Sequence, residues 1–154
     1  MRAEKDKIIM GYLRKNARSS LTKLSRMTQI PVSTIYDKLK QFEKSIIKKH
    51  TCILDYKKLG YDVRMTSLLK ANKETKEKLL MYLMNHASIN NISRINGEFD
   101  FLIEAIFENI DDMDSFTREL DDFDITKKES YFIIEDLKKE QFLDIDMQVL
   151  GPHK

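Results

Sequence analysis

One short stretch of the chain carries side chains that can read base edges and hold phosphates. Apolar residues recur at Ile35, Leu39 and Phe42, the spacing of one buried helix side. The other sides carry hydroxyls, an amide and two ammonium groups: Ser33, Thr34, Tyr36, Lys38, Lys40 and Gln41. Lysine reaches phosphate or guanine, glutamine suits adenine, and hydroxyls suit either. The stretch is therefore a candidate DNA-reading helix, with a solvated surface of an ordinary helical hairpin as the alternative.

The residues before this stretch predict a second helix that positions it. Ser20 can cap a helix in which Leu21, Leu24 and Met27 form one buried stripe. The next three residues carry no helical pattern. Pro31 then suits the first turn of a new helix, because its missing N–H would have no partner there. The two segments predict a helix-turn-helix.

A third helix is predicted over residues 5–17, where Ile9, Met10 and Leu13 recur at helical spacing. Arg18 and Ser19 follow it, and with Lys44 they are candidates for phosphate contacts. The three helices would form a winged-type helix-turn-helix unit. Its expected core residues are Ile9, Leu13, Leu24, Ile35, Leu39 and Phe42.

Charge divides the chain into two halves of opposite sign. Residues 1–60 hold 15 Lys and Arg against 5 Asp and Glu, a balance of +10, whereas residues 61–154 hold 12 against 20, a balance of −8. A basic half suits the phosphate backbone, and the acidic half should face away from DNA.

Other partners and compartments are disfavoured by composition. The single Cys52 and three scattered histidines make no zinc-ligand pair. No apolar run approaches the roughly 18–20 residues of a membrane span, and the N-terminal residues lack the apolar run of a signal peptide. The sequence predicts a cytoplasmic protein without a metal, a cofactor or a membrane partner.

The acidic half alternates strand and helix patterns. Strands are predicted over residues 63–71, 89–95, 99–107 and 130–135, and helices over residues 73–86 and 111–123. This β-α-β-β-α-β order is that of a ferredoxin-like sandwich, so the fold class is α+β.

Three features of the sequence suggest contacts beyond one folded domain. The strand at residues 99–107 is apolar on both faces, which predicts that a second subunit's sheet covers one of them, with a partner for Glu104 at that interface. A short extended stretch that could pair with its copy in a second subunit is suggested by Ile46, Ile47, Cys52, Ile53 and Leu54. The apolar tail, residues 139–154, is expected to pack on the body or on a partner.

The chain resembles the Lrp/AsnC family of prokaryotic transcription regulators along residues 5–138. The motifs that carry the resemblance lie in order along the chain: Asp6, Ile9, Met10, Leu13, Asn16, Ala17 and Arg18; Leu24–Ser25; Ile35, Lys38–Leu39 and Phe42–Glu43; Leu54–Asp55 and Leu59–Gly60–Tyr61; and Gly97–Glu98–Phe99–Asp100.

The resemblance implies a DNA-binding regulator with an effector domain of the RAM type. Such domains pair sheet to sheet into dimers, which commonly assemble into octamers, and they bind amino acids near the turn that here is Gly97, Glu98, Phe99 and Asp100. From the residues alone, Gly97 permits a tight turn, and Asp100 either meets a ligand's ammonium group or caps the turn.

The expected domains are a DNA-binding unit (residues 1–50), a connector (51–61), an effector and dimerisation domain (62–138) and a tail (139–154). The predicted function is sequence-specific binding of a palindromic double-stranded operator. Two alternatives stand beside it: a sensor or architectural DNA-binding protein with weak sequence preference, and an enzyme similar to sirohaem decarboxylases. The enzyme is disfavoured because the second half offers few histidines and arginines.

Overall fold

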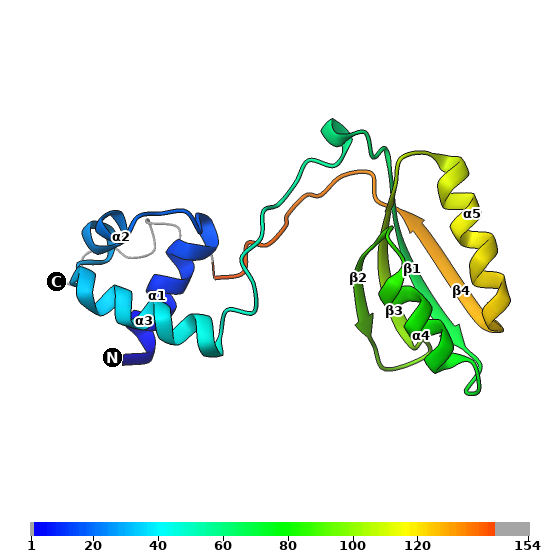
Figure 1. The fold of residues 1–154 in the computed structure, drawn as a ribbon, viewed down its shortest axis with the longest axis horizontal. Coiled ribbons are helices and arrows are strands. Elements are labelled where there is room, and N and C mark those ends of the chain that lie inside the picture. Colours follow the sequence, from blue (N-terminus) through cyan, green and yellow to red (C-terminus); the bar gives the residue numbers. More distant parts are fainter. Residues whose placement is uncertain (1, 144–154) are drawn as a thin grey trace. The chain divides into compact units, whose positions relative to one another are not determined.

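The computed structural model describes residues 2–143, which divide into two compact units (Figure 1). The first unit contains residues 2–53 together with residues 137–143, and the second contains residues 54–136. Each unit has its own hydrophobic core. The chain therefore passes between the units twice, and the described part of the tail belongs with the first unit.

The first unit consists of three helices, α1 (Arg2–Lys15), α2 (Leu21–Thr28) and α3 (Val32–Ser45). The Ser20 hydroxyl caps α2 as predicted, accepting a hydrogen bond from the Lys23 backbone N–H at 3.2 Å. Pro31 takes the cap position of α3, one residue earlier than the first turn expected from the sequence. Helix α1 also begins and ends earlier than predicted.

The core of this unit differs in detail from the expected one. Its buried side chains are Ile9, Tyr12, Leu24, Ile30, Ile35 and Phe42. Leu13 and Leu39, which were expected in the core, are only half-buried and pack against its border. Tyr12 and Ile30 take their places, Ile30 from the turn where the sequence shows no helical pattern.

The described residues 46–62 form no β-strand, so the predicted wing is not formed within this chain. The connector contains one turn of 3-10 helix, η1 (Lys57–Leu59), which ends at Gly60 with φ +88°. Glycine is favoured there because a side chain would be strained at that angle.

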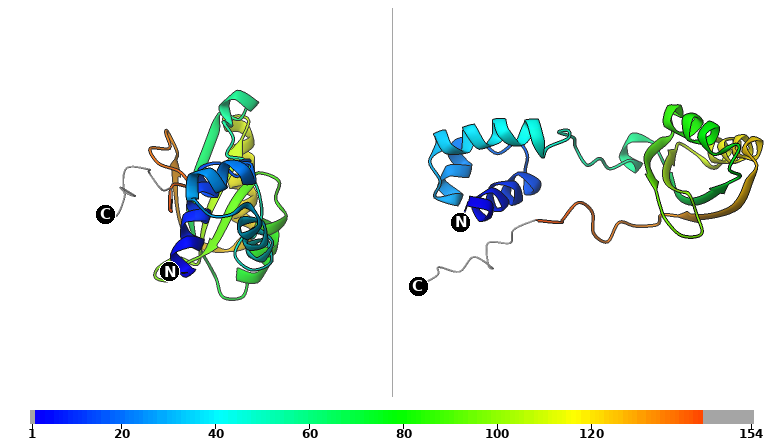
Figure 2. Two further views of the ribbon diagram at one scale, coloured as in Figure 1. Left: turned by 90° about the vertical axis from the view of Figure 1, so that its left-hand side faces the viewer. Right: turned by 90° about the horizontal axis from the view of Figure 1, so that it is seen from below.

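The second unit is a four-stranded antiparallel sheet with two helices on one face (Figure 2). Its elements are β1 (Val63–Ala71), α4 (Lys76–Asn85), β2 (Ile89–Arg94), β3 (Phe101–Phe107), α5 (Ile110–Leu120) and β4 (Ile125–Phe132), with η2 (Asp121–Phe123) after α5. The strand order is β2-β3-β1-β4. The predicted β-α-β-β-α-β fold is confirmed.

The boundaries of several elements differ from the predicted ones, most of all in β4. That strand was expected over residues 130–135, but it pairs with β1 from Ile125 to Phe132. Pairing with β1 decides the limits, and polar residues such as Lys127 and Lys128 are accommodated because this edge strand is largely exposed. Helix α4 begins three residues later than expected, and β3 begins at Phe101 instead of residue 99.

Strand β3 shows how the two faces of the sheet differ. Phe101, Ile103, Ala105 and Phe107 alternate along it and are buried beneath α4 and α5. The residues between them point to the other face, which we call the open face. There Leu102 and Glu104 are half-buried and Ile106 is buried. The open face of this single chain is thus only partly covered, as the two-sided apolar pattern suggested.

Asp100 ties the turn before β3 to the far end of β1 and to α4. Its backbone N–H donates to the Leu69 carbonyl at 2.9 Å, and its carboxylate accepts from the Ala71 backbone N–H at 3.2 Å. The same carboxylate forms an ion pair with Lys76 in the first turn of α4. The hydrogen bond from Lys76 and, to a lesser extent, that from Ala71 lower the pKa of Asp100, while burial opposes the shift.

We expect Asp100→Asn to destabilise the second unit by about 1–3 kcal/mol, because a half-buried, charge-assisted hydrogen-bond network is broken. A carboxyl with a lowered pKa stabilises the fold above its unfolded pKa of about 3.9, and this stabilisation is lost as the pH falls through the folded pKa. The wild type should therefore lose more stability than the variant between neutral and acidic pH.

Urea unfolding followed across this pH range measures both effects. Asp114→Asn is the matched control, because Asp114 pairs with Arg118 on the exposed side of α5 and should contribute less than about 1 kcal/mol. Equal pH dependence in wild type and Asp100→Asn would contradict the role of Asp100.

Candidate DNA-binding and effector sites

Helix α3 presents a polar surface opposite its buried side. Ile35 and Phe42 lie in the core, whereas the candidate DNA-reading residues Ser33, Thr34, Tyr36, Lys40 and Gln41 are exposed. The Lys40 ammonium lies 4.5 Å from the centre of the Tyr36 ring. The hydrogen bond with Tyr36 raises the pKa of Lys40 above its ordinary value.

Lys38 lies differently from the other candidates on α3. Its side chain is only 13% exposed and forms an ion pair with Asp6 of α1. Its ammonium also lies 5.9 Å from the centre of the Phe42 ring. Lys38 stands three residues after Ile35, so it lies at the edge of the buried side, where Asp6 is available. The structure thus gives Lys38 a contact between helices, in place of the exposed position that the sequence led us to expect.

The candidate phosphate-binding residues Arg18, Ser19 and Lys44 flank the helices. Arg18 and Lys44 are exposed and form no ion pair within the described residues. The Asn16 side chain accepts a hydrogen bond from the Arg18 backbone N–H at 2.9 Å, which shapes the turn before α2. Ser19 is half-buried beside this turn.

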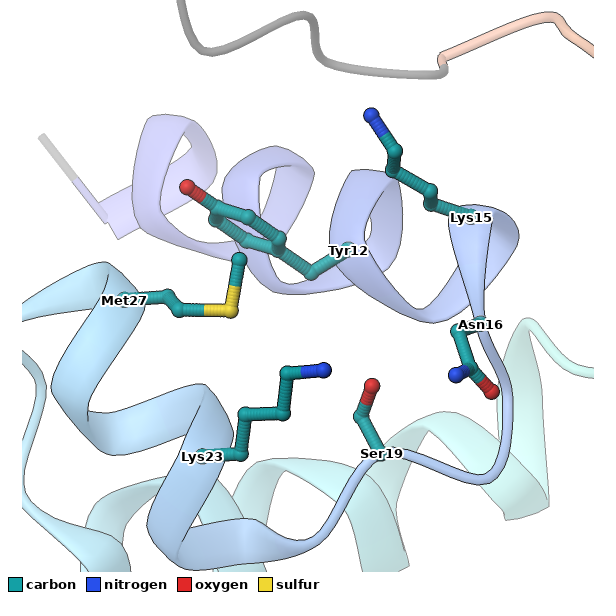
Figure 3. A pocket seen from close by; sticks show the side chains of 6 residues that line it. All are labelled: Tyr12, Lys15, Asn16, Ser19, Lys23 and Met27. Atoms are coloured by element: carbon teal, nitrogen blue, oxygen red, sulfur yellow. The ribbon is translucent and has the colours of Figure 1, made fainter.

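A pocket of about 300 Å³ lies between α1 and the start of α2 (Figure 3). Its lining residues are Tyr12, Lys15, Asn16, Ser19, Lys23 and Met27. The Lys23 ammonium and the Ser19 hydroxyl point toward one another in this hollow, and Lys15 points away from them. Lys23 was not among the sequence candidates, although its place in the first turn after Ser20 put it beside Ser19.

The turn before β3 gathers the candidate effector residues. Gly97 has φ +99°, so the tight turn expected there does need glycine. Glu98 forms an ion pair of 2.5 Å with Lys127 of β4, and this hydrogen bond lowers the pKa of Glu98 and raises that of Lys127. The Lys127 ammonium also lies 4.7 Å from the centre of the Phe99 ring.

Lys127 therefore belongs to this site, although no motif or periodicity in the sequence pointed to it. Residues 98 and 127 are 29 positions apart, and the pairing of β1 with both β3 and β4 brings them together. Asp100, by contrast, directs its carboxylate to Ala71 and Lys76 of its own chain. The turn-capping alternative for Asp100 thus agrees with its contacts.

Glu104 on the open face has partners within the chain. Its carboxylate pairs with Arg64 at 3.2 Å and accepts from the side chains of Asn90 and Asn91 at 3.3 and 3.1 Å. Arg64 also pairs with Asp136 at 2.7 Å. The expectation that Glu104 finds its partner at a subunit interface needs correction, because the adjacent strands β1 and β2 already provide three donors.

No group of three or more potential metal ligands occurs among residues 2–143. None of the helices in the same range is long and apolar enough to cross a membrane.

Most of the chain is similar in sequence to known transcription regulators. A sequence model described as the Lrp/AsnC ligand binding domain matches residues 65–143, just over half of the chain. An uncharacterised HTH-type transcriptional regulator of Pyrococcus furiosus is 30% identical over 121 residues, covering 76% of this chain and 78% of its own. Another, from Pyrococcus abyssi, is 28% identical over 140 residues, covering 90% and 95%. These relatives are named as regulators and not as enzymes.

Solved structures share the fold at low sequence identity. A transcriptional regulator of Neisseria meningitidis, in a complex with L-Met, has a TM-score of 0.80 at 19% identity, covering 88% of this chain and 91% of its own. LrpC of Bacillus subtilis has a TM-score of 0.79 at 21% identity, covering 87% and 95%. Together, the matched domain and the relatives show that the chain belongs to the Lrp/AsnC family, the family that its sequence motifs predicted.

Proposed function

We propose that this protein is a DNA-binding transcription regulator that acts as a dimer and responds to an amino acid. The polar surface of α3 carries the proposal, because five exposed side chains capable of base contacts stand opposite the side on which Ile35 and Phe42 are buried. A helix with one such surface suits the major groove. The relatives named as HTH-type transcriptional regulators support the same function.

The phosphate contacts are assigned to cations that have no ion-pair partner among the described residues. Arg18, Lys23, Lys40 and Lys44 are exposed in the first unit, and Ser19 can add a hydroxyl beside Lys23. Such contacts fix a protein on the duplex, whereas Ser33, Thr34 and Gln41 can reach base edges. Lys38 is excluded from this set because Asp6 and the packing of α3 on α1 already engage it.

Dimerisation is proposed through the open face of the sheet. Leu68 and Leu102 are half-buried there and lie directly opposite one another on β1 and β3. A sheet with one face covered by helices can bury such residues against a second sheet. Dimers would place two α3 helices on a palindromic operator, and further assembly is expected from the family resemblance. The protein is expected to act in the cytoplasm.

The amino-acid effector is proposed to bind beside Gly97, Glu98, Phe99 and Asp100. The match to a ligand binding domain and the complex of the Neisseria regulator with L-Met support an amino-acid effector.

The second candidate function, an architectural protein with weak sequence preference, requires only the phosphate contacts. Selection of bound DNA from random duplex pools separates the two functions, since enrichment of one palindromic sequence is expected only for the regulator.

Removal of a phosphate-binding cation should reduce the salt dependence of DNA binding. The logarithm of the association constant for DNA falls linearly with the logarithm of the salt concentration. We expect Lys40→Ala and Lys44→Ala each to flatten this slope by about 0.9 for every phosphate that a bound copy no longer neutralises. Lys38→Ala should leave the slope unchanged and lower the stability of the first unit, because Asp6 would have no partner.

Fluorescence anisotropy at several salt concentrations measures the slopes, and thermal unfolding measures the stability. A flattened slope for Lys38→Ala with the stability of the wild type would show that Lys38 contacts phosphate in the complex.

A charge on the open face should prevent dimerisation without unfolding the chain. We expect Leu68→Arg to be monomeric in sedimentation, because an arginine there would be buried against the second sheet. Glu129 lies directly opposite Leu68 on β4, so the monomer can accommodate the new cation. Met84→Arg on the exposed side of α4 is the control and should keep the dimer mass. A Leu68→Arg variant that remains dimeric would exclude the open face as the dimer interface.

A further inference from the structure

Two lysines stand directly opposite one another on the open face. Lys70 of β1 pairs in register with Lys127 of β4. Leu69 is fully buried beneath the helices, so Lys70 points to the opposite, open face of the sheet. Directly opposed residues have Cβ atoms about 5 Å apart, and like charges at this spacing are destabilising. An anion placed between the two ammonium groups would relieve the repulsion.

Lys127 forms ion pairs within the chain, whereas Lys70 interacts with Glu98 and Asp100 only through its charge among the described residues. Lys127 pairs with Glu98 at 2.5 Å and with Glu129 at 3.6 Å. Lys70 forms no ion pair within the described residues. It still acts on the turn, because the pKa of Glu98 is lowered first by the hydrogen bond of Lys127 and also by the charge of Lys70.

The charges around the turn sum to zero. Lys70, Lys76 and Lys127 balance Glu98, Asp100 and Glu129, and the Lys76–Asp100 pair is engaged in holding α4. A ligand with a net negative charge would disturb this balance, but a zwitterion would keep it. Glu98 is three-quarters exposed on its turn, so it can move from Lys127 toward an incoming ammonium group.

We propose that Lys70 and Lys127 bind the carboxylate of a zwitterionic amino acid and that Glu98 binds its ammonium group. This assignment rests on the proposed amino-acid response and specifies which side chains hold each end of the ligand. Hydrogen bonds between ions of opposite charge are the strong ones, so the two lysines would provide much of the affinity. The opposed pair is then a functional arrangement that the ligand-free sheet tolerates at some loss of stability.

The test uses the full-length protein and thermal unfolding with each proteinogenic L-amino acid in turn. The amino acid that raises the midpoint most is then compared with its carboxamide, its decarboxylated amine and its 2-oxo acid. We expect neither the carboxamide nor the amine to raise the midpoint. The 2-oxo acid should bind more weakly than the amino acid, because it lacks the ammonium group that Glu98 is proposed to bind. In the Glu98→Gln variant, the affinities of the two compounds should differ less.

Variants separate ligand binding from a structural role. Lys70→Gln and Lys127→Gln should each weaken amino-acid binding by about tenfold or more, which corresponds to the loss of one charge-assisted hydrogen bond. Without ligand, Lys70→Gln should unfold at the same midpoint as the wild type or a higher one, because a repulsion has been removed. Lys78→Gln on α4 is the matched control and should bind like the wild type.

Several results would overturn the assignment. The assignment fails, while the proposed amino-acid response stands, if an amino acid raises the midpoints of Lys70→Gln and Lys127→Gln as much as that of the wild type. It also fails if the decarboxylated amine binds as tightly as the amino acid. It also fails if Lys70→Gln lowers the ligand-free midpoint or dissociates the dimer, because the lysine then serves a subunit interface. A wild type that responds to no amino acid removes the proposed effector response itself.

Discussion

The helices of the second unit cover one face of its sheet only, and the functional assignments in that unit depend on this constraint. Burial beneath α4 and α5 fixes the register of each strand, because a shift by one residue would expose the apolar set. The same register decides which side chains share the open face. It places apolar Leu68 beside Leu102 in the middle and Lys70 opposite Lys127 near one end. Packing of the hydrophobic core thus determines the geometry of a surface that the core does not include.

Charged groups on the open face are compensated to different degrees at its two ends. Near the start of β1, Arg64 pairs with both Glu104 and Asp136. Half-buried charges are stable only with such partners. Near the other end of β1, the chain supplies Lys70 with no partner among the described residues. The end with two ion pairs at Arg64 is suited to structure, whereas the end at Lys70 is where we propose that the ligand binds.

Periodicity was sufficient to predict the order of the elements and, apart from Lys38, the exposed side of α3, because helix and strand repeats depend on neighbours in sequence. It could not predict contacts between distant segments. Lys38 meets Asp6 32 residues away, and Glu98 meets Lys127 29 residues away, so both pairings follow only from tertiary packing. The same reason explains β4, whose limits are set by pairing with β1 and not by its own apolar run at residues 131–134. Local pattern thus predicted the position of α3 more precisely than the contacts of the turn at Gly97 and Glu98.

Dimerisation and DNA binding are linked because only four cations of each copy are assigned to phosphate contacts. The four cations assigned to phosphate contacts in each copy would give a salt slope of about −3.6, and two copies would give about −7, in the range of specific regulators. A single three-helix unit therefore has modest electrostatic affinity, and joining two copies turns the second contact into an intramolecular event. If the open face joins the copies, a ligand beside that face could alter DNA affinity without touching α3. The sheet that buries the core would then also determine how strongly the first unit is held on DNA.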